Sequence, residues 1–236
     1  MDASGYTTLT RQAGLMREMD VIAQNIANIS TSGFRREGVV FSEYVQRMEE
    51  GPSLSMAYGN ARAVDLSQAG VTSTGGSYDF AIQGEGFFLI ETPDGQHLSR
   101  AGAFTPSAAG ELVTPDGFRL LDEGGAPVFV PPDAGPVAMS QDGTLSANGV
   151  PLARIGLWQP VDPLSLLHQA GTRFSADAVE PAEGAVLLQG FLEDSNVEPV
   201  TEIARMIAVQ RAYELGQTFL DREDNRLRGI IETLGR

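Results

Sequence analysis

Cysteine is missing from this chain of 236 residues. Without thiols it can form no disulfide framework, no Cys-ligated metal centre and no thiol nucleophile. Lysine is missing too, so all 16 basic residues are arginine, and histidine occurs only at His97 and His168. Neither histidine has a chemical partner close to it in the sequence. We therefore expect both to be structural or to face solvent.

The chain also lacks a long apolar run and a recognisable leader. No stretch of about 18 apolar residues is present, so we expect no transmembrane segment. The opening MDASGYTTLTRQAG has neither the basic start nor the compact apolar stretch of a secretory signal peptide. These features predict a cytoplasmic protein, or one that is exported by another route.

Positive charge is scarce relative to negative charge. The 31 acidic residues outnumber the basic ones, and the formal net charge is −15. Residues 51–192 hold 15 of the acidic residues and only 5 basic ones, whereas both ends of the chain are nearly balanced. An acidic surface repels phosphate, so the composition argues against nucleic-acid binding.

Catalytic signatures are not found either. The sequence contains no HExxH, GxSxG or Walker motif. Gly84-Glu85-Gly86 has part of the spacing of a dinucleotide-binding loop, but it precedes a strand-like run and not a helix, which favours a tight turn. The Asp-Gly pairs lack the ligand spacing of a calcium loop. We predict no catalytic, cofactor-binding or metal-binding residue, and no enzyme.

Proline placement divides the chain into helical ends and a β-rich middle. All 13 prolines lie between Pro52 and Pro199, and proline breaks helix interiors. Residues 71–192 carry short strand-like runs separated by hairpin turn signals. These signals are Asp94-Gly95, Asp116-Gly117, Asp142-Gly143 and Asn148-Gly149.

The two ends show the apolar spacing of long helices. A first helix is expected over residues 4–29, with its apolar residues at alternating intervals of four and three, a heptad seam: Leu15, Met19, Ile22, Ile26 and Ile29. A last helix is expected over residues 199–234, with a seam every seven residues: Met206, Tyr213, Leu220, Leu227 and Leu234, with Ile203, Val209 and Ile230 on the same side.

The last helix carries a second apolar stripe, roughly opposite the first at about 100° per residue. Its members are Ala204, Ala208, Ala212, Leu215 and Phe219. A helix that is apolar on two sides needs neighbours on two sides. This pattern predicts that the chain works as part of a larger assembly.

The predicted fold is therefore α+β, with long terminal helices that pair as a coiled coil around a central, mainly β domain. The expected divisions are an N-terminal helix over residues 1–33, an extended connector over residues 34–70, the β domain over residues 71–192 and a C-terminal helix over residues 193–236. Both terminal helices are assigned to an inner-tube domain.

Three segments carry motifs. Residues 23–36 read AQNIANISTSGFRR. Residues 81–117 include AIQGEGFF, SRAGAF and GELVTPDG, and residues 195–214 include SNVEPVTE and QRAYE. Taken together and in this order, they resemble the signatures of the rod and hook family of flagellar axial proteins. Gln24 stands where the family commonly has Asn.

The resemblance implies a structural subunit of the flagellar basal-body rod. Such proteins leave the cell through the flagellar type III export apparatus, without a cleaved signal peptide, and polymerise in the periplasm. Their terminal helices form an inner tube, and the rod transmits torque from motor to hook. The implied partners are other copies of the chain, other rod proteins and the export apparatus. Length and the opening residues favour a proximal-rod member.

The resemblance and the two seams together give a set of predicted subunit-interface residues. On the N-terminal side these are Leu15, Met19, Ile22, Asn25, Ile26, Asn28, Ile29 and Phe34. On the C-terminal side they are Ile203, Met206, Gln210, Tyr213, Phe219, Leu220 and Leu227. Asn25 and Asn28 either bond between helices or face solvent.

Alternatives to a proximal-rod subunit remain at this point. A distal-rod or hook-type subunit would share the motifs, although hook proteins are much longer. A secreted enzyme with a β catalytic domain would need a convergent polar site within residues 71–192, and the sequence offers no candidate triad or metal set. A soluble coiled-coil adaptor would leave the central β motif unexplained.

Overall fold

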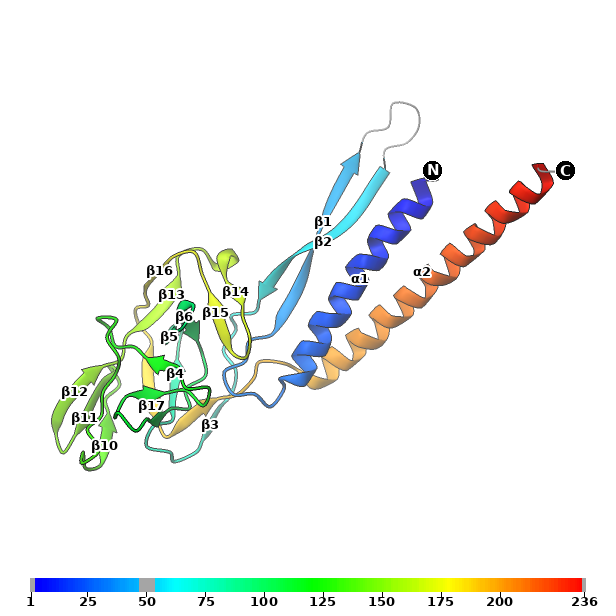
Figure 1. Ribbon diagram of the computed structural model, residues 1–236. Coiled ribbons are helices and arrows are strands. Elements are labelled where there is room, and N and C mark those ends of the chain that lie inside the picture. The colour runs from blue at the N-terminus through cyan, green and yellow to red at the C-terminus, as the bar shows by residue number, and fades with distance from the viewer. Residues whose placement is uncertain (1–2, 47–53, 235–236) are drawn as a thin grey trace. The chain divides into compact units, whose positions relative to one another are not determined.

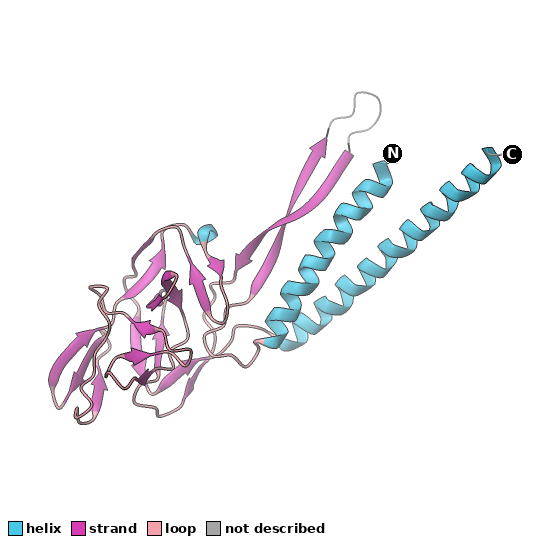
Figure 2. Cartoon of the chain, in the orientation of Figure 1, coloured by secondary structure: helices cyan, strands magenta, loops and turns pink. Residues whose placement is uncertain are grey.

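The computed structural model describes residues 3–46 and 54–234. One long helix lies near each end of the chain, and the elements between them are almost all strands (Figure 2). The elements are α1 (Ala3–Ala27), β1 (Glu37–Gln46), β2 (Leu54–Val64), β3 (Val71–Ser73), β4 (Phe80–Gln83), β5 (Phe87–Thr92), β6 (Gly95–Ser99), β7 (Thr105–Pro106), β8 (Leu112–Val113), β9 (Arg119–Leu120), β10 (Val137–Met139), β11 (Thr144–Ala147), β12 (Val150–Arg154), β13 (Leu157–Pro160), a short 3-10 helix (Pro163–Ser165), β14 (Leu167–His168), β15 (Arg173–Ser175), β16 (Val179–Pro181), β17 (Val186–Gln189), β18 (Phe191–Glu193) and α2 (Pro199–Leu234). The α+β class and the mainly β centre are confirmed.

The chain divides into two compact units. The helical unit comprises Met1–Ala27, Glu37–Ala63 and Glu198–Arg236. The β unit comprises Asn28–Arg36 and Val64–Val197. Compactness thus groups β1 and most of β2 with the helices. The four-part division expected from the sequence describes stretches of chain and not compact bodies, and it stays a prediction.

In the helical unit, α1 and α2 lie side by side, and β1 and β2 pair in a two-stranded sheet that contacts α1 through β1 (Figure 1). The first helix is shorter than the sequence predicted, because it ends at Ala27 and not at Ile29. After it the backbone turns: the Thr31 N–H donates to the Asn28 carbonyl at 3.1 Å, and Gly33 has φ +72°. The second helix begins at Pro199, as expected.

The β unit is built around a sheet in the order β14-β15-β6-β5-β9-β8-β7, with β13 pairing β5 and β16. Strand β5 is buried at five of its six positions, because its side chains enter two cores. One core includes Phe88 and Ile90, and the other includes Phe87 and Leu89. This alternation places apolar cores on both faces of β5.

The predicted hairpin turns are found between β5 and β6, β8 and β9, β10 and β11, and β11 and β12. Asn148 and Gly149 both have positive φ, 52° and 79°, the conformation that a two-residue hairpin turn requires. In the β10–β11 turn, hydrogen bonds from Ser140 and Thr144 lower the pKa of Asp142 to about 2.

Gly84 and Gly86 join β4 to β5 with φ values of 113° and 116°, so this segment is a turn and not a nucleotide-binding loop. Neither helix, over its described residues, has the length and apolar character that crossing a bilayer requires.

Candidate assembly surface

The two terminal helices of the helical unit contact each other in antiparallel order. Gln12 of α1 donates to the Tyr213 carbonyl of α2 at 2.9 Å, and Glu18 of α1 forms an ion pair with Arg205 of α2 at 3.0 Å. Positions that rise along α1 therefore meet positions that fall along α2.

A small apolar core joins the two helices. Leu15, Ile22 and Val209 are its buried members, and five half-buried side chains pack on them: Met19, Ile26, Met206, Ala212 and Tyr213. Every member of the first-helix seam that lies within α1 is in this cluster. Ala212 was assigned to the second stripe, but it faces α1.

Asn25 connects three segments of the helical unit. Its Nδ2 donates to the Glu37 carbonyl at 2.8 Å and to the Glu202 carboxylate at 3.2 Å, while its Oδ1 accepts from the Glu37 N–H at 3.0 Å. Asn25 is fully buried. The structure thus decides between the two readings of this residue: Asn25 bonds to α2 and to the start of β1, and does not face solvent.

The carboxylate of Glu37 is buried, and few partners offset the cost of burying its charge. The Glu37 side chain is 1% exposed. Its Oε2 pairs with Arg62 Nη1 at 3.4 Å, and the Arg62 side chain is 52% exposed. Burial raises the pKa of Glu37, and the attraction of Arg62 opposes that rise. The other carboxylate oxygen, Oε1, has no hydrogen-bond partner. No pattern in the sequence pointed to Glu37. Glu202 is the last residue of the SNVEPVTE motif, but nothing in the sequence assigned it a role.

A groove of about 370 Å³ lies where the middle of α2 meets the first half of α1. Its apolar walls include Leu15, Leu215 and Phe219. Gly216 also lines the groove, and a Cβ at this position would press on the Gln12 amide. Gly216 therefore allows the two helices to approach closely at this point.

Much of the surface of α2 is apolar and exposed. Its large apolar side chains with 42% exposure or more are Val200, Ile203, Ile207, Leu215, Phe219, Leu227, Ile230 and Ile231. Ile203 was assigned to the seam with Met206, but it is 50% exposed because it lies about 120° around the helix from Val209, which is buried against α1.

Leu227 is exposed for a different reason. At about 100° per residue it continues the line of Val209 and Leu220 that faces α1. However, α1 pairs with α2 in antiparallel order, and Thr8 near its start already lines the groove at Phe219. The seam of α2 therefore continues beyond the groove without a described α1 side chain opposite it.

The remaining predicted interface residues have mixed positions. Gln210 is exposed, whereas Leu220 is half-buried. Asn28, Ile29 and Phe34 lie past the end of α1, in the β unit. Asn28 accepts from the Thr31 hydroxyl at 3.1 Å. Of the seam residues, Leu234 has a side chain outside the described set.

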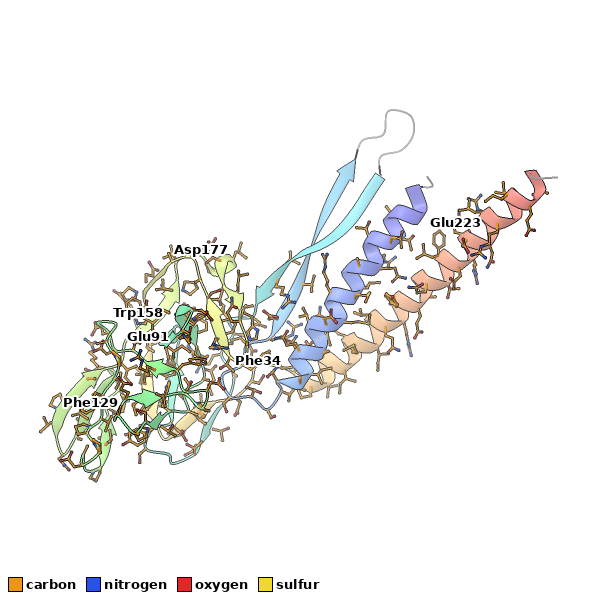
Figure 3. The ribbon with its side chains drawn as sticks, viewed as in Figure 1. Phe34, Glu91, Phe129, Trp158, Asp177 and Glu223 are labelled. Atoms are coloured by element: carbon orange, nitrogen blue, oxygen red, sulfur yellow. The ribbon has the colours of Figure 1, made fainter. Side chains whose placement is uncertain are left out.

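Phe34, which is labelled in Figure 3, is fully buried. Its ring meets His168 edge-on, with centroids 5.3 Å apart. His168 also contacts Phe174 at 5.1 Å. The other histidine, His97, lies 3.0 Å from the Thr92 hydroxyl through Nδ1. Both histidines therefore have structural contacts within the β unit.

Comparison with known families reproduces the three motif segments. Residues 6–35 match the family described as flagella basal body rod protein. Residues 81–147 match the flagellar hook protein FlgE/F/G D1 domain, and residues 188–233 match the flagellar basal body rod FlgEFG protein C-terminal region.

Individual relatives extend the similarity over the full chain. The flagellar basal-body rod protein FlgF of Caulobacter vibrioides is 36% identical over 244 residues, and FlgF of Mesorhizobium japonicum is 35% identical, each alignment covering 100% of this chain and 99% of the relative. FlgG of Bacillus subtilis is 30% identical over 261 residues, covering 96% of this chain and 97% of the relative. This chain therefore belongs to the family of flagellar basal-body rod proteins.

Proposed function

We propose that this chain is a proximal-rod subunit of the FlgF type, which polymerises with copies of itself and with other rod proteins through its terminal helices. In this proposal α1 and α2 pair as a coiled coil within an inner tube, and the rod that they build transmits torque. The chain is 36% and 35% identical to the two FlgF relatives but 30% identical to the FlgG relative. This difference supports a place in the proximal rod over one in the distal rod.

The exposed apolar face of α2 carries this proposal. Leu215 is 73% exposed and Val200 is 75% exposed on a helix that already buries its opposite side against α1. Burying apolar surface contributes roughly 25 cal/mol per Å². A neighbour on this face would therefore stabilise both partners, and a helix from the next subunit supplies the same apolar surface in return.

The predicted interface residues take different parts in this scheme. Ile203, Gln210, Phe219 and Leu227 are proposed to contact neighbouring subunits directly, because their side chains are exposed. The predicted residues that pack between α1 and α2 are proposed to act by holding the helix pair in shape. These are Leu15, Met19, Ile22, Asn25, Ile26, Met206 and Tyr213. Leu220, which is half-buried, is proposed to act in the same way.

Asn28, Ile29 and Phe34 follow α1 in the β unit. They are proposed to shape the segment that leaves the helix. Their contribution to the interface would then be indirect.

The role is proposed to be structural and not catalytic. Among the described residues, no group of three or more His, Asp and Glu side chains is arranged to hold a metal ion. The buried polar side chains described above bond to the chain's own backbone and carboxylates. We also propose, as the family resemblance implied, that the flagellar export apparatus delivers the chain to the periplasm.

A matched pair of substitutions tests the assembly surface. Leu215→Asp puts a carboxylate on the exposed face of α2, and Leu164→Asp makes the same change at a residue that is 78% exposed in the β unit. Neither change disturbs the isolated fold, because both side chains already face solvent. Leu215→Asp buries an unpaired charge only if a neighbour covers that face.

In cells in which each variant replaces the natural gene, we expect Leu215→Asp to abolish swimming and to be missing from purified basal bodies. Leu164→Asp should be incorporated normally. Equal amounts of both variants in basal bodies would mean that this face of α2 is not covered, and the proposed mode of polymerisation would be wrong.

A further inference from the structure

The chain crosses from one unit to the other four times. We call each crossing point a passage, and on the β-unit side all four passages lead into segments that are bonded to one another. The passages lie at 27/28, 36/37, 63/64 and 197/198. On the β-unit side their ends belong to three segments: residues 28–36, residues 64–70 and residues 193–197. These segments are far apart in sequence, so only side-chain and backbone bonds between them can hold their ends together.

Asn196 joins all three segments with one side chain. Its Nδ2 donates to the carbonyls of Asp65 and Ser67, both at 3.0 Å, and its Oδ1 accepts from the Arg36 N–H at 2.6 Å. The backbone adds two bonds: the Asn196 N–H donates to the Phe34 carbonyl at 3.3 Å, and the Asp65 N–H donates to the Arg36 carbonyl at 2.8 Å.

Glu193 ties the same segments together beneath the surface. Its Oε1 accepts from the Ala69 N–H and from Arg35 Nη2, both at 2.9 Å, and its backbone carbonyl accepts from the Gly33 N–H at 2.8 Å. Arg35 and Glu193 are 2% and 1% exposed. Burial lowers the pKa of Arg35, and the attraction of Glu193 limits that drop.

Arg100 fastens this cluster to the sheet. Its Nε donates to the second oxygen of Glu193, and its Nη2 donates to the carbonyls of Ile82 at 3.0 Å and Gly84 at 2.7 Å. Its Nη1 donates to the Gly86 carbonyl. Arg100 thus holds the turn between β4 and β5, whose strands enter the main core of the β unit.

We propose that Asn196 and Glu193 form a latch that makes the four passages move as one body at the β unit. Asn196 and Glu193 each bond to both of the other segments, residues 28–36 and residues 64–70. Moving any one of the three segments relative to the other two would therefore break several hydrogen bonds. This inference rests on the proposed function, because a rod subunit must carry a twisting force through these passages. The latch then distributes the force over all four passages, so that no single segment separates from the β unit before the others.

The β unit offers a matched control for Asn196. Gln189 also uses one side-chain amide to join remote backbone segments: it donates to the carbonyls of Ser77 at 2.8 Å and Val137 at 3.0 Å, and accepts from the Met139 N–H at 2.9 Å. Asn196→Ala and Gln189→Ala therefore each remove one accepted bond and two bonds donated to carbonyls, and Asn196→Ala also removes a longer contact of 3.4 Å to the Ser67 hydroxyl. Only the first removes them from the passages.

Hydrogen exchange on the purified full chain tests the latch directly. In Asn196→Ala we expect the amides of Arg36 and Asp65 to exchange about tenfold faster than in the unmodified chain. In Gln189→Ala the amide of Met139 should accelerate instead, with Arg36 and Asp65 unchanged. Unchanged exchange of Arg36 and Asp65 in Asn196→Ala would overturn the latch.

Swimming in a viscous medium tests whether the latch helps the subunit to carry a twisting force. Cells with Asn196→Ala should still build hooks and filaments, but should lose swimming in a viscous medium and release filaments with attached rod fragments. Cells with Gln189→Ala should swim like the unmodified strain. Equal swimming of both variants at high viscosity would overturn the mechanical role. Absence of the unmodified chain from basal bodies would instead overturn the proposed function, and the exchange experiment would still decide the latch.

Discussion

At the scale of single residues, buried polar side chains in this chain bond mainly to its own backbone. Asn25 shows the pattern, because one amide holds both backbone groups of Glu37 and also reaches Glu202. The motif that contains Asn25 was visible in the sequence, but its partners were not. Glu37 and Glu202 lie 12 and 177 positions away, and no local periodicity connects them.

Replacing Asn25 should weaken the helical unit. Asn25→Ala removes three hydrogen bonds, and we expect it to lower the free energy of unfolding by about 2–3 kcal/mol. Asn25→Asp should be worse, because it turns an oxygen toward the Glu37 carbonyl and the Glu202 carboxylate in place of a donor. Urea unfolding followed by circular dichroism measures both changes.

The control for Asn25 is Asn28→Ala. Asn28 is half-buried and accepts from the nearby Thr31 hydroxyl, so its loss should cost less than about 1 kcal/mol. Equal costs at the two positions would mean that the bonds of Asn25 do not hold the unit together.

Glu37 gives a prediction for pH dependence. Because burial raises its pKa, the carboxyl favours the folded state most below its unfolded pKa of about 4.3, and that contribution is lost as pH rises through the folded pKa. Glu37→Gln should therefore stabilise the chain at pH 7, by on the order of 1 kcal/mol. The gain should vanish near pH 4. Urea midpoints at both pH values measure it, and a less stable variant at pH 7 would show that the carboxylate is well compensated.

At the scale of elements, the two faces of α2 differ in how far the sequence could define them. Both stripes were visible as spacing, and the bounds of the helix followed from Pro199. The assignment of Ile203 to the same side as the seam was wrong, because Ile203 lies about 120° around the helix from Val209 and is half exposed. The exposure of Leu227 depends on the register of α1 against α2, which no single-helix pattern contains.

Two glycines in α2 should respond differently to the same change. A Cβ at Gly229 meets nothing within 4 Å, so Gly229→Ala should stabilise the helix by about 0.5–1 kcal/mol through propensity. Gly216→Ala should bring no such gain, because the new methyl group displaces the Gln12 amide from its bond to Tyr213. Thermal unfolding of the two variants measures the difference, and equal gains would show that α1 does not press on α2 at Gly216.

At the scale of the whole molecule, the buried cores are distributed unequally between the units. Among the side chains that the structure describes, the two cores of the β unit have twelve and six buried apolar members, whereas the core between α1 and α2 has three. The sequence predicted a mainly β centre through its turn signals, and a last helix that needs neighbours on two sides. It could not predict that β1 and β2 would group with the helices, because their spacing resembles an extended connector.

This inequality predicts two levels of stability in the isolated chain. The amides of α1 and α2 should exchange with solvent at least about a hundredfold faster than those of β5 and β6, because the smaller core makes the helical unit open more readily than the β unit. Exchange measured by mass spectrometry on the monomer tests this. Equal protection of helices and sheet would show that the helical unit is stable without neighbours.

The order of segments along the chain has a consequence for synthesis. The helical unit draws on segments that come first, third and last in sequence, whereas every residue of the β unit precedes Pro199. A growing chain on the ribosome can therefore complete its β unit while α2, with its apolar outer face, has yet to be made. An interrupted chain would carry a folded β unit without the face of α2 that we propose joins subunits. Under the proposed function, an incomplete copy would then be excluded from the polymer and would not block its growth.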